Sequence, residues 1–184
     1  MDTIYRHSEL TIMEAAGDGP HHVLPGISAT LRETQPSVKI GSSNLVYTPY
    51  VRNEIEHSKL GSRGWTYQEG LLSQKNLVFT DNQTHFQCNA MHCLENIYAP
   101  LESLHTSKIV RMRDKVEISR AFHLHGLGRK LEDLEDQLRE YLGRSLTFES
   151  DILDAFKGVL AAFERKPSKP VKVSAESQSY APIH

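Results

Sequence analysis

The sequence has no hydrophobic run long enough to cross a membrane, no excess of one charge and only two cysteines. Its longest uninterrupted apolar stretch is residues 159–163, whereas a membrane-spanning helix needs about 20 residues. The N-terminus has an acidic second residue and no apolar segment behind a basic start, so it does not resemble a secretory signal. These absences favour a cytoplasmic protein in which Cys88 and Cys93 stay reduced.

The charges nearly cancel, because 21 Lys and Arg stand against 23 Asp and Glu and give a net charge of −2. A basic field that would attract nucleic acid or an anionic membrane is therefore absent. With 184 residues, of which 39% are hydrophobic, the chain has the size of one domain with a modest core. No segment recurs at a fixed period, which excludes a repeat array.

Short strands are expected in the first half of the chain, after a helical turn in residues 1–7. Residues 10–16 are β-branched and apolar and end at a Gly-Asp-Gly-Pro turn, which predicts a buried strand. Two apolar pieces in a loop-rich region predict further short strands at residues 38–40 and 45–51. Two apolar runs flank the turn formers Asp81-Asn82-Gln83, which predicts a hairpin of residues 76–80 and 84–88.

Helices are expected around residues 63–73 and again beyond Pro100. In the first, Trp65, Glu69 and Leu72 share one face behind a Ser62 cap. A second helix should span residues 131–142 and end near Gly143. A third should follow Ser150 and pack against the second. Its predicted apolar face consists of Ile152, Leu153, Phe156, Val159, Leu160 and Phe163.

The predicted fold is therefore α/β or α+β. A small, incomplete sheet packs against helices, a helical segment follows, and residues 166–184 form a disordered tail without large apolar side chains before Tyr180.

A group of soft metal ligands falls within nine positions, namely His85, Cys88, His92 and Cys93. A structural zinc site brings paired ligands from two knuckles, whereas strand alternation sends His85 and Cys88 to opposite faces. A metal-dependent module would carry stoichiometric zinc, but the spacing argues against it, and we predict no metal site.

The segment from Arg63 to Glu69 has two coherent interpretations. Arg63 could hold an anion, Trp65 or Tyr67 could stack on a ring, and Glu69 could act as an acid or a base. Alternatively, the tryptophan anchors the helix to the sheet and the acid accepts hydrogen bonds from loop backbone, which needs no ligand.

The same segment resembles a known family. Residues 63–73, Arg-Gly-Trp-Thr-Tyr-Gln-Glu-Gly-Leu-Leu-Ser, followed by Leu-Val-Phe-Thr at 77–80 and Phe-Gln-Cys at 86–88, resemble the C-terminal motif of the fungal heterokaryon incompatibility (HET) domain. Upstream, residues 1–5, 15–18 and 24–26 resemble the helix, strand and turn that precede that motif. Downstream, residues 144–164 resemble the helical region that often follows it.

The resemblance implies a division of the chain. Residues 1–100 would be the C-terminal part of a HET-like domain, residues 101–165 the helical region and residues 166–184 a tail. The family's earlier half, with a Trp-Val-Asp-like strand and a Cys-Ile-Asp/Asn-Gln-like motif, is absent from this sequence, so we expect a fragment, a mis-started gene product or a shortened relative that has lost function. If that half supplies central strands, residues 10–16 would form an exposed sheet edge that invites association.

The resemblance also implies a function in non-self recognition, with the domain as the effector of programmed cell death. Protein partners or self-association are expected, without cofactor, nucleic acid or membrane. A suggested similarity of the family to TIR domains gives an alternative, an enzyme that cleaves NAD as its substrate. In that case Glu69 would be catalytic, and Arg63, Trp65 and Tyr67 would line the binding site.

Overall fold

The computed structural model describes residues 2–19, 21–27, 30–32, 34–88, 90–98, 100, 122, 127–128 and 130–165. The predicted tail and most of residues 101–129 lie outside this set. Among the described residues the fold is mixed α and β, a small sheet with packed helices, as predicted. No helix in these ranges has both the length and the apolar composition of a membrane span.

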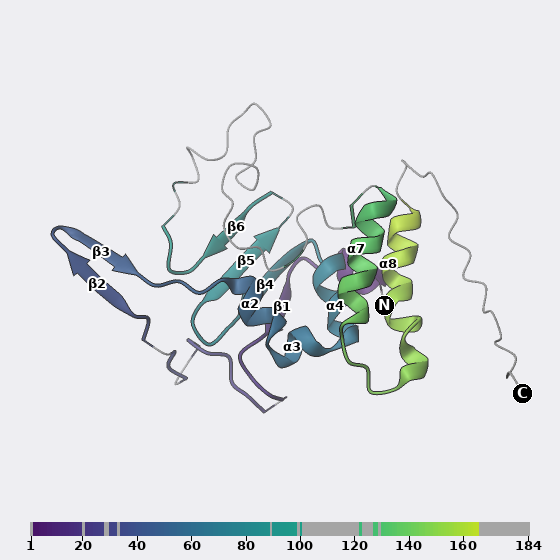
Figure 1. Ribbon diagram of the computed structural model, residues 1–184, viewed down its shortest axis with the longest axis horizontal. Coiled ribbons are helices and arrows are strands. Elements are labelled where there is room, and N and C mark those ends of the chain that lie inside the picture. The colour runs from purple at the N-terminus through teal and green to yellow at the C-terminus, as the bar shows by residue number, and fades with distance from the viewer. Residues whose placement is uncertain are drawn as a thin grey trace, which may run out of the picture.

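Four strands form the main sheet in the order β1-β4-β5-β6 (Figure 1). The strand predicted at residues 10–16 is confirmed as Thr11–Glu14, although the predicted burial is wrong for Leu10 and Ile12, which lie at the sheet edge and are 41% and 59% exposed. The predicted hairpin is confirmed as well. β1 runs parallel to β4, whereas β4, β5 and β6 are successively antiparallel. The strands are β1 (Thr11–Glu14), β4 (Lys75–Phe79), β5 (Thr84–Cys88) and β6 (His92–Leu94).

The connection between the parallel strands β1 and β4 carries a separate hairpin and three helices. The hairpin consists of β2 (Ser37–Ile40) and β3 (Ser43–Val46), and it stands away from the rest of the molecule (Figure 1). The helices are α2 (Val51–Glu56), α3 (Lys59–Ser62) and α4 (Gly64–Leu72). A parallel pair needs such a crossover, because a tight turn can join only antiparallel strands.

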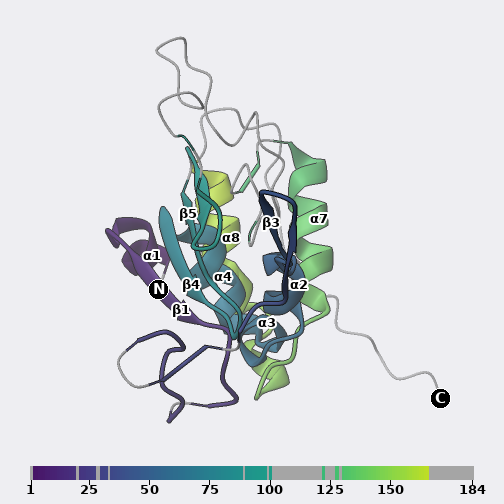
Figure 2. The same ribbon diagram turned by 90° about the vertical axis from the view of Figure 1, so that its left-hand side faces the viewer.

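The remaining helices pack beside α4. They are α1 (Asp2–His7), α7 (Leu131–Leu142) and α8 (Asp154–Glu164), with a 3-10 turn at Glu149–Asp151 before α8. Figures 1 and 2 show α4 between the sheet and the α7–α8 pair. The predicted pairing of the last two helices is confirmed, since the rings of Tyr141 and Phe156 lie 4.9 Å apart between centroids.

Two hydrophobic clusters form the core, one on each side of α4. The first joins α4 to α7 and α8 through Tyr67, Leu71, Leu134, Tyr141, Ala155, Phe156, Val159 and Phe163. The second joins the sheet to α2 through Met13, Ala15, Val51, Ile55, Val78 and Leu94. The side chain of Asn76 on β4 donates to the carbonyl of Gly70 at 2.9 Å and thereby ties α4 to the sheet.

Three further local predictions are wrong. Ser62 does not cap α4, because it ends α3 and its hydroxyl donates to the Lys59 carbonyl; Arg63 is the N-cap. The strand expected at residues 45–51 ends at Val46, and Val51 already begins α2. Ile152 and Leu153 are 42% and 62% exposed, because they precede α8 and turn away from its buried face.

Gly61 allows α3 to follow α2 closely. A Cβ at this position would lie 1.8 Å from the Ile55 carbonyl oxygen, whereas a Cβ at Gly19 meets no heavy atom of the described chain within 4 Å. We therefore expect Gly61→Ala to lower the free energy of unfolding by about 1–3 kcal/mol through overpacking. Urea denaturation measures this change. Gly19→Ala is the matched control, and an equal loss in both variants would contradict the steric explanation.

Candidate functional site

The four residues singled out in the sequence lie on α4 and its N-cap. The start of the helix is fixed by two backbone hydrogen bonds to the segment after α7. The Gly64 N–H donates to the Ser145 carbonyl at 2.8 Å, and the Ser145 N–H donates to the Ser62 carbonyl at 2.7 Å. The side chains of α4 differ in burial, since Tyr67 is buried whereas Trp65 and Glu69 are half-buried.

Trp65 and Glu69 lie one helical turn apart on the same side of α4, as predicted. Both are half-buried, and the indole packs against the cluster that joins α4 to α7 and α8. The Tyr5 hydroxyl of α1 donates a hydrogen bond to Glu69. Burial first, then this hydrogen bond and the carboxylate's charge, raise the pKa of Tyr5 to about 12. The structure thus pairs the carboxylate with a tyrosine hydroxyl beside the indole.

Arg63 and Tyr67 do not form one group with Trp65 and Glu69. Arg63 is exposed, and its side chain forms no hydrogen bond or ion pair with the described residues. Tyr67 is buried, with its ring 6.4 Å from that of Phe156 at 17° and 5.9 Å from that of Tyr141. The faces of the Tyr67 ring are therefore occupied by protein side chains. The catalytic and binding roles of these four residues remain predictions.

Arg144, from the segment after α7, is the cation that lies over the ring of Tyr67. Its guanidinium carbon lies 4.6 Å from the centroid of the Tyr67 ring, which is the geometry of a cation–π contact. Glu140 Oε1 lies 3.8 Å from Arg144 and 3.7 Å from Arg52, and Arg52 also bonds Glu56 at 2.6 Å. Burial lowers the pKa of Arg144, while Glu140 opposes that shift. This charge cluster links α2 to α7, and no sequence pattern predicts it.

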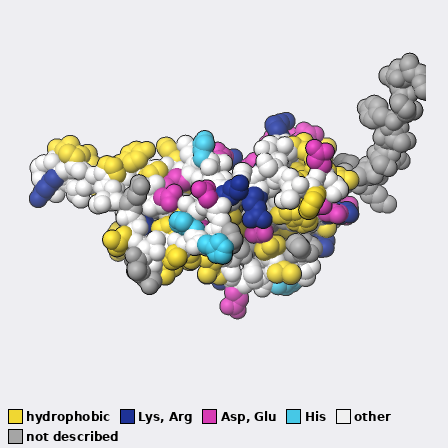
Figure 3. Space-filling model, turned by 90° about the horizontal axis from the view of Figure 1, so that it is seen from below, with side chains coloured by type: hydrophobic (Ala, Val, Ile, Leu, Met, Phe, Trp, Pro, Cys, Tyr) yellow, Lys and Arg dark blue, Asp and Glu magenta, His cyan; other side chains and the backbone are white. Residues whose placement is uncertain are grey.

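The face of the molecule seen from below carries charged side chains of both signs (Figure 3). Near the middle of this face, Lys and Arg side chains lie next to Asp and Glu side chains (Figure 3). Hydrophobic side chains gather around them and extend over the projecting arm at the left. Side chains of both charge signs are thus mixed on this face, and neither sign forms a large continuous patch.

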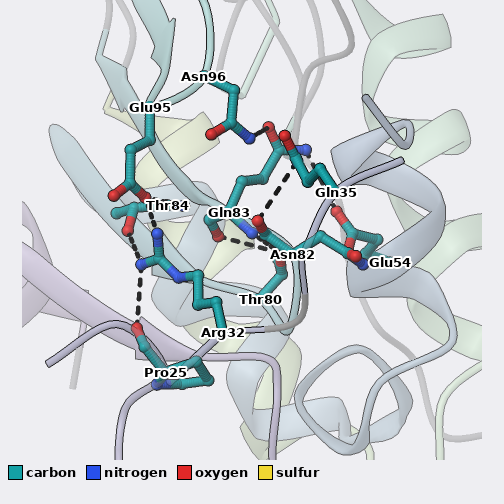
Figure 4. A network of polar contacts seen from close by, with 10 residues as sticks. All are labelled: Pro25, Arg32, Gln35, Glu54, Thr80, Asn82, Gln83, Thr84, Glu95 and Asn96. Carbon is teal, nitrogen blue, oxygen red and sulfur yellow. Dashed lines mark hydrogen bonds and ion pairs between the residues drawn. The ribbon is translucent and has the colours of Figure 1, made fainter. Parts of the chain in front are cut away.

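A second polar network lies at the carboxyl ends of β1 and β4 (Figure 4). Gln83 is fully buried in the β4–β5 turn, and its side chain donates to the carbonyl of Pro49 at 3.1 Å and to Glu54 at 3.4 Å. Asn82 donates to the other oxygen of Glu54 at 2.6 Å. The carboxylate of α2 therefore receives two amide donors, and it fixes the helix to the turn.

This network was not predicted from the sequence. The sequence pattern indicates only a turn at Asn82 and Gln83, and their partner Glu54 lies inside the crossover, with α3, α4 and β4 between it and the turn. Below the same turn, Arg32 donates to Glu95 and Thr84 and ties its loop to the sheet (Figure 4). A hydrogen bond between segments so far apart leaves no spacing pattern that sequence reasoning could use.

The four soft ligands separate onto the two faces of the sheet. His85 and His92 lie on the face that packs against α2, with ring centroids 6.5 Å apart, and both are buried. Cys88 and Cys93 are half-buried free thiols on the opposite face. Among the residues that the structure describes, no three His, Cys, Asp or Glu side chains form a possible metal site.

Comparison with known proteins gives one match. The family model described as "Heterokaryon incompatibility protein (HET)" matches residues 1–69. Residues 1–69 are a HET-family segment. No curated protein and no solved structure matches the chain.

The HET segment includes α1, β1, the β2–β3 hairpin, α2 and α3, and it ends within α4 at Glu69. Three of the four predicted site residues lie on the part of α4 and its N-cap that precedes this end, and Glu69 is its last residue. The β4–β5 hairpin and the helix pair, which also carried part of the resemblance, lie beyond the match. The position of the segment within a complete HET domain remains a prediction.

The Tyr67 hydroxyl is buried without a hydrogen-bond partner in the described structure. Burial raises its pKa, and Glu140 adds to this shift while Arg144 opposes it. Because an unpartnered buried hydroxyl is unfavourable, we expect Tyr67→Phe to leave the free energy of unfolding within about 1 kcal/mol of wild type or to raise it. Tyr67→Ala should lower it by about 3–5 kcal/mol, since it removes the ring from the core. Both changes are measured by denaturant unfolding, and a large loss in Tyr67→Phe would show that the hydroxyl has a partner.

His85 should make the fold sensitive to acid. Burial, and to a smaller extent the neighbouring His92, lower its pKa from 6.5 to about 4, and neither ring nitrogen has a hydrogen-bond partner in the described ranges. The unfolded chain therefore binds a proton that the folded chain does not between these two values. Stability from this group is complete above pH 6.5 and falls as the pH drops toward 4, by about 3 kcal/mol.

The test compares unfolding free energies at pH 7 and near pH 4.5. His85→Leu should be less sensitive to this change in pH than wild type. His57 is an exposed histidine on the α2–α3 connection, and His57→Leu should keep the wild-type sensitivity. Equal acid sensitivity of wild type and His85→Leu would show that other groups account for it.

Proposed function

We propose that the protein is an effector module of fungal heterokaryon incompatibility, which acts in the cytoplasm through contacts with other proteins. Its role would be in non-self recognition and in the programmed cell death that follows. The observation that carries the proposal is the HET-family match of residues 1–69. The family relationship itself rests on that match, whereas the cell-death role is the step that needs an experiment.

The β2–β3 hairpin within the HET segment supports an action through protein contacts. Strand alternation and pairing place Val38, Ile40, Leu45 and Tyr47 on one face of the hairpin. They are 55%, 61%, 53% and 64% exposed. Within the described ranges the hairpin belongs to no larger sheet, and two strands alone are marginally stable in water.

An apolar face on a projecting hairpin is typical of a surface that another protein covers. The arm with its hydrophobic side chains is visible in Figure 3. Lys39 and Asn44, paired across the two strands, lie on the opposite face and give that side a polar character. The hairpin thus offers one apolar and one mainly polar side, which allows a matched comparison.

The test is inducible expression in a fungal host, with surviving colonies counted against an uninduced culture. We expect the wild-type chain to reduce survival. The double variant Val38→Ser/Leu45→Ser should restore survival while changing stability by less than about 0.5 kcal/mol per site, because both side chains are exposed. Lys39→Ser on the opposite face is the control and should still reduce survival.

Full survival with folded wild-type protein present in the cells would contradict the effector role. Glu69→Gln distinguishes the NAD-cleaving alternative, because it removes the charge and keeps an oxygen that can accept from Tyr5. If Glu69→Gln alone restored survival and the hairpin variant did not, chemistry at the carboxylate would replace protein contact as the explanation.

A further inference from the structure

Among the described residues, the backbone of β1 has one side without a strand partner. The Ala15 N–H donates to the Phe79 carbonyl at 2.8 Å. In a parallel ladder, alternate residues direct both backbone groups to the same neighbour. Met13 and Thr11 are two and four residues before Ala15, so their backbone N–H and C=O groups also point toward β4. The residues that alternate with them direct these groups away from the sheet.

The outward residues are Leu10, Ile12 and Glu14. β1 is the last strand on its side of the sheet (Figure 2). The N–H and C=O groups of these three residues form no hydrogen bond in the part of the chain that the structure describes. Leu10 is 41% and Ile12 59% exposed, so the edge is open and apolar.

Ile12 also ends a row of side chains across the sheet. The register places Ile12 beside Leu77, Leu77 beside Phe86, and Phe86 beside Cys93. This row lies on the face opposite to the one that α2 covers, and its three inner members are half-buried. The row is thus complete except at Ile12, where the next strand would stand.

We propose that β1 pairs antiparallel with β1 of a second copy of this chain, around a twofold axis at Ile12. In this register the two Ile12 side chains are neighbours, and Leu10 of each copy lies opposite Glu14 of the other. The outward groups of both strands are then satisfied together, and the apolar row continues into the second sheet.

The charges fit this register. No carboxylate is placed directly opposite its own copy, because Glu14 faces a leucine. Glu14 is also held by His22, whose Nδ1 lies 2.7 Å from its carboxylate. A second copy of the chain carries the same edge, with Leu10, Ile12 and Glu14 directed outward, and therefore fits this register. A second copy of the chain would be one protein partner for the proposed effector role. The dimer itself does not depend on that role, whereas its use in the cell rests on the proposed function.

The test is sedimentation equilibrium of the purified full chain. Wild type should dimerise, and Ile12→Pro should weaken the dimer by at least about tenfold in Kd, because it removes an outward N–H and spares those that face β4. Ile12→Lys should weaken it as well, since like charges would meet at the axis. Ile12→Val keeps the N–H and the apolar side chain, and it should dimerise like wild type.

Circular dichroism and thermal unfolding show whether each variant folds, and Ile12→Lys remains informative if Ile12→Pro does not fold. A monomeric wild type would overturn the proposal, and so would a dimer that folded Ile12→Pro and Ile12→Lys both leave intact. These outcomes are independent of colony survival. A dimer without any effect on survival would contradict the effector role alone.

Discussion

The burial of α4 between the sheet and the α7–α8 pair is the constraint on which the rest of the fold depends. One side of this helix supplies Tyr67 and Leu71 to the cluster with α7 and α8. The other end of the helix is held by the bond from Asn76 to the Gly70 carbonyl. A helix enclosed on both sides needs small residues where neighbouring side chains press against its backbone, and Gly64 and Gly70 meet this need. An added Cβ would lie 2.6 Å from Leu146 at the first and 2.2 Å from Phe122 at the second.

This position of α4 explains why its side chains differ in chemistry. Tyr67 faces the helix pair, where its hydroxyl has no hydrogen-bond partner among the described residues and a guanidinium lies over its ring. Trp65 packs against the same cluster but is only half-buried, and Glu69 is half-buried next to the Tyr5 hydroxyl. A single short helix thus separates a packing role from a surface that has polar groups available.

The sequence predicted those elements whose signal is local. The strand at residues 10–16, the hairpin around Asp81-Asn82-Gln83 and the helix ending near Gly143 all depend on neighbours within a few positions, and all three are confirmed. The errors arise where a distant segment decides. Arg63 is exposed while Arg144 covers Tyr67, because the packing of α7 determines which guanidinium reaches the ring. The Glu54 network has the same origin, since its amide donors come from the turn beyond β4, about 30 residues further along the chain.

The parallel pairing of β1 with β4 has a consequence for the order of events during synthesis. β1 leaves the ribosome before its hydrogen-bonding partner β4, which follows only after the hairpin, α2, α3 and α4 have been translated. Until then both long sides of this apolar strand are open, and contacts between segments so distant form slowly. The nascent chain is therefore exposed to chaperones, and to neighbouring nascent chains on the same message, for the whole of that interval.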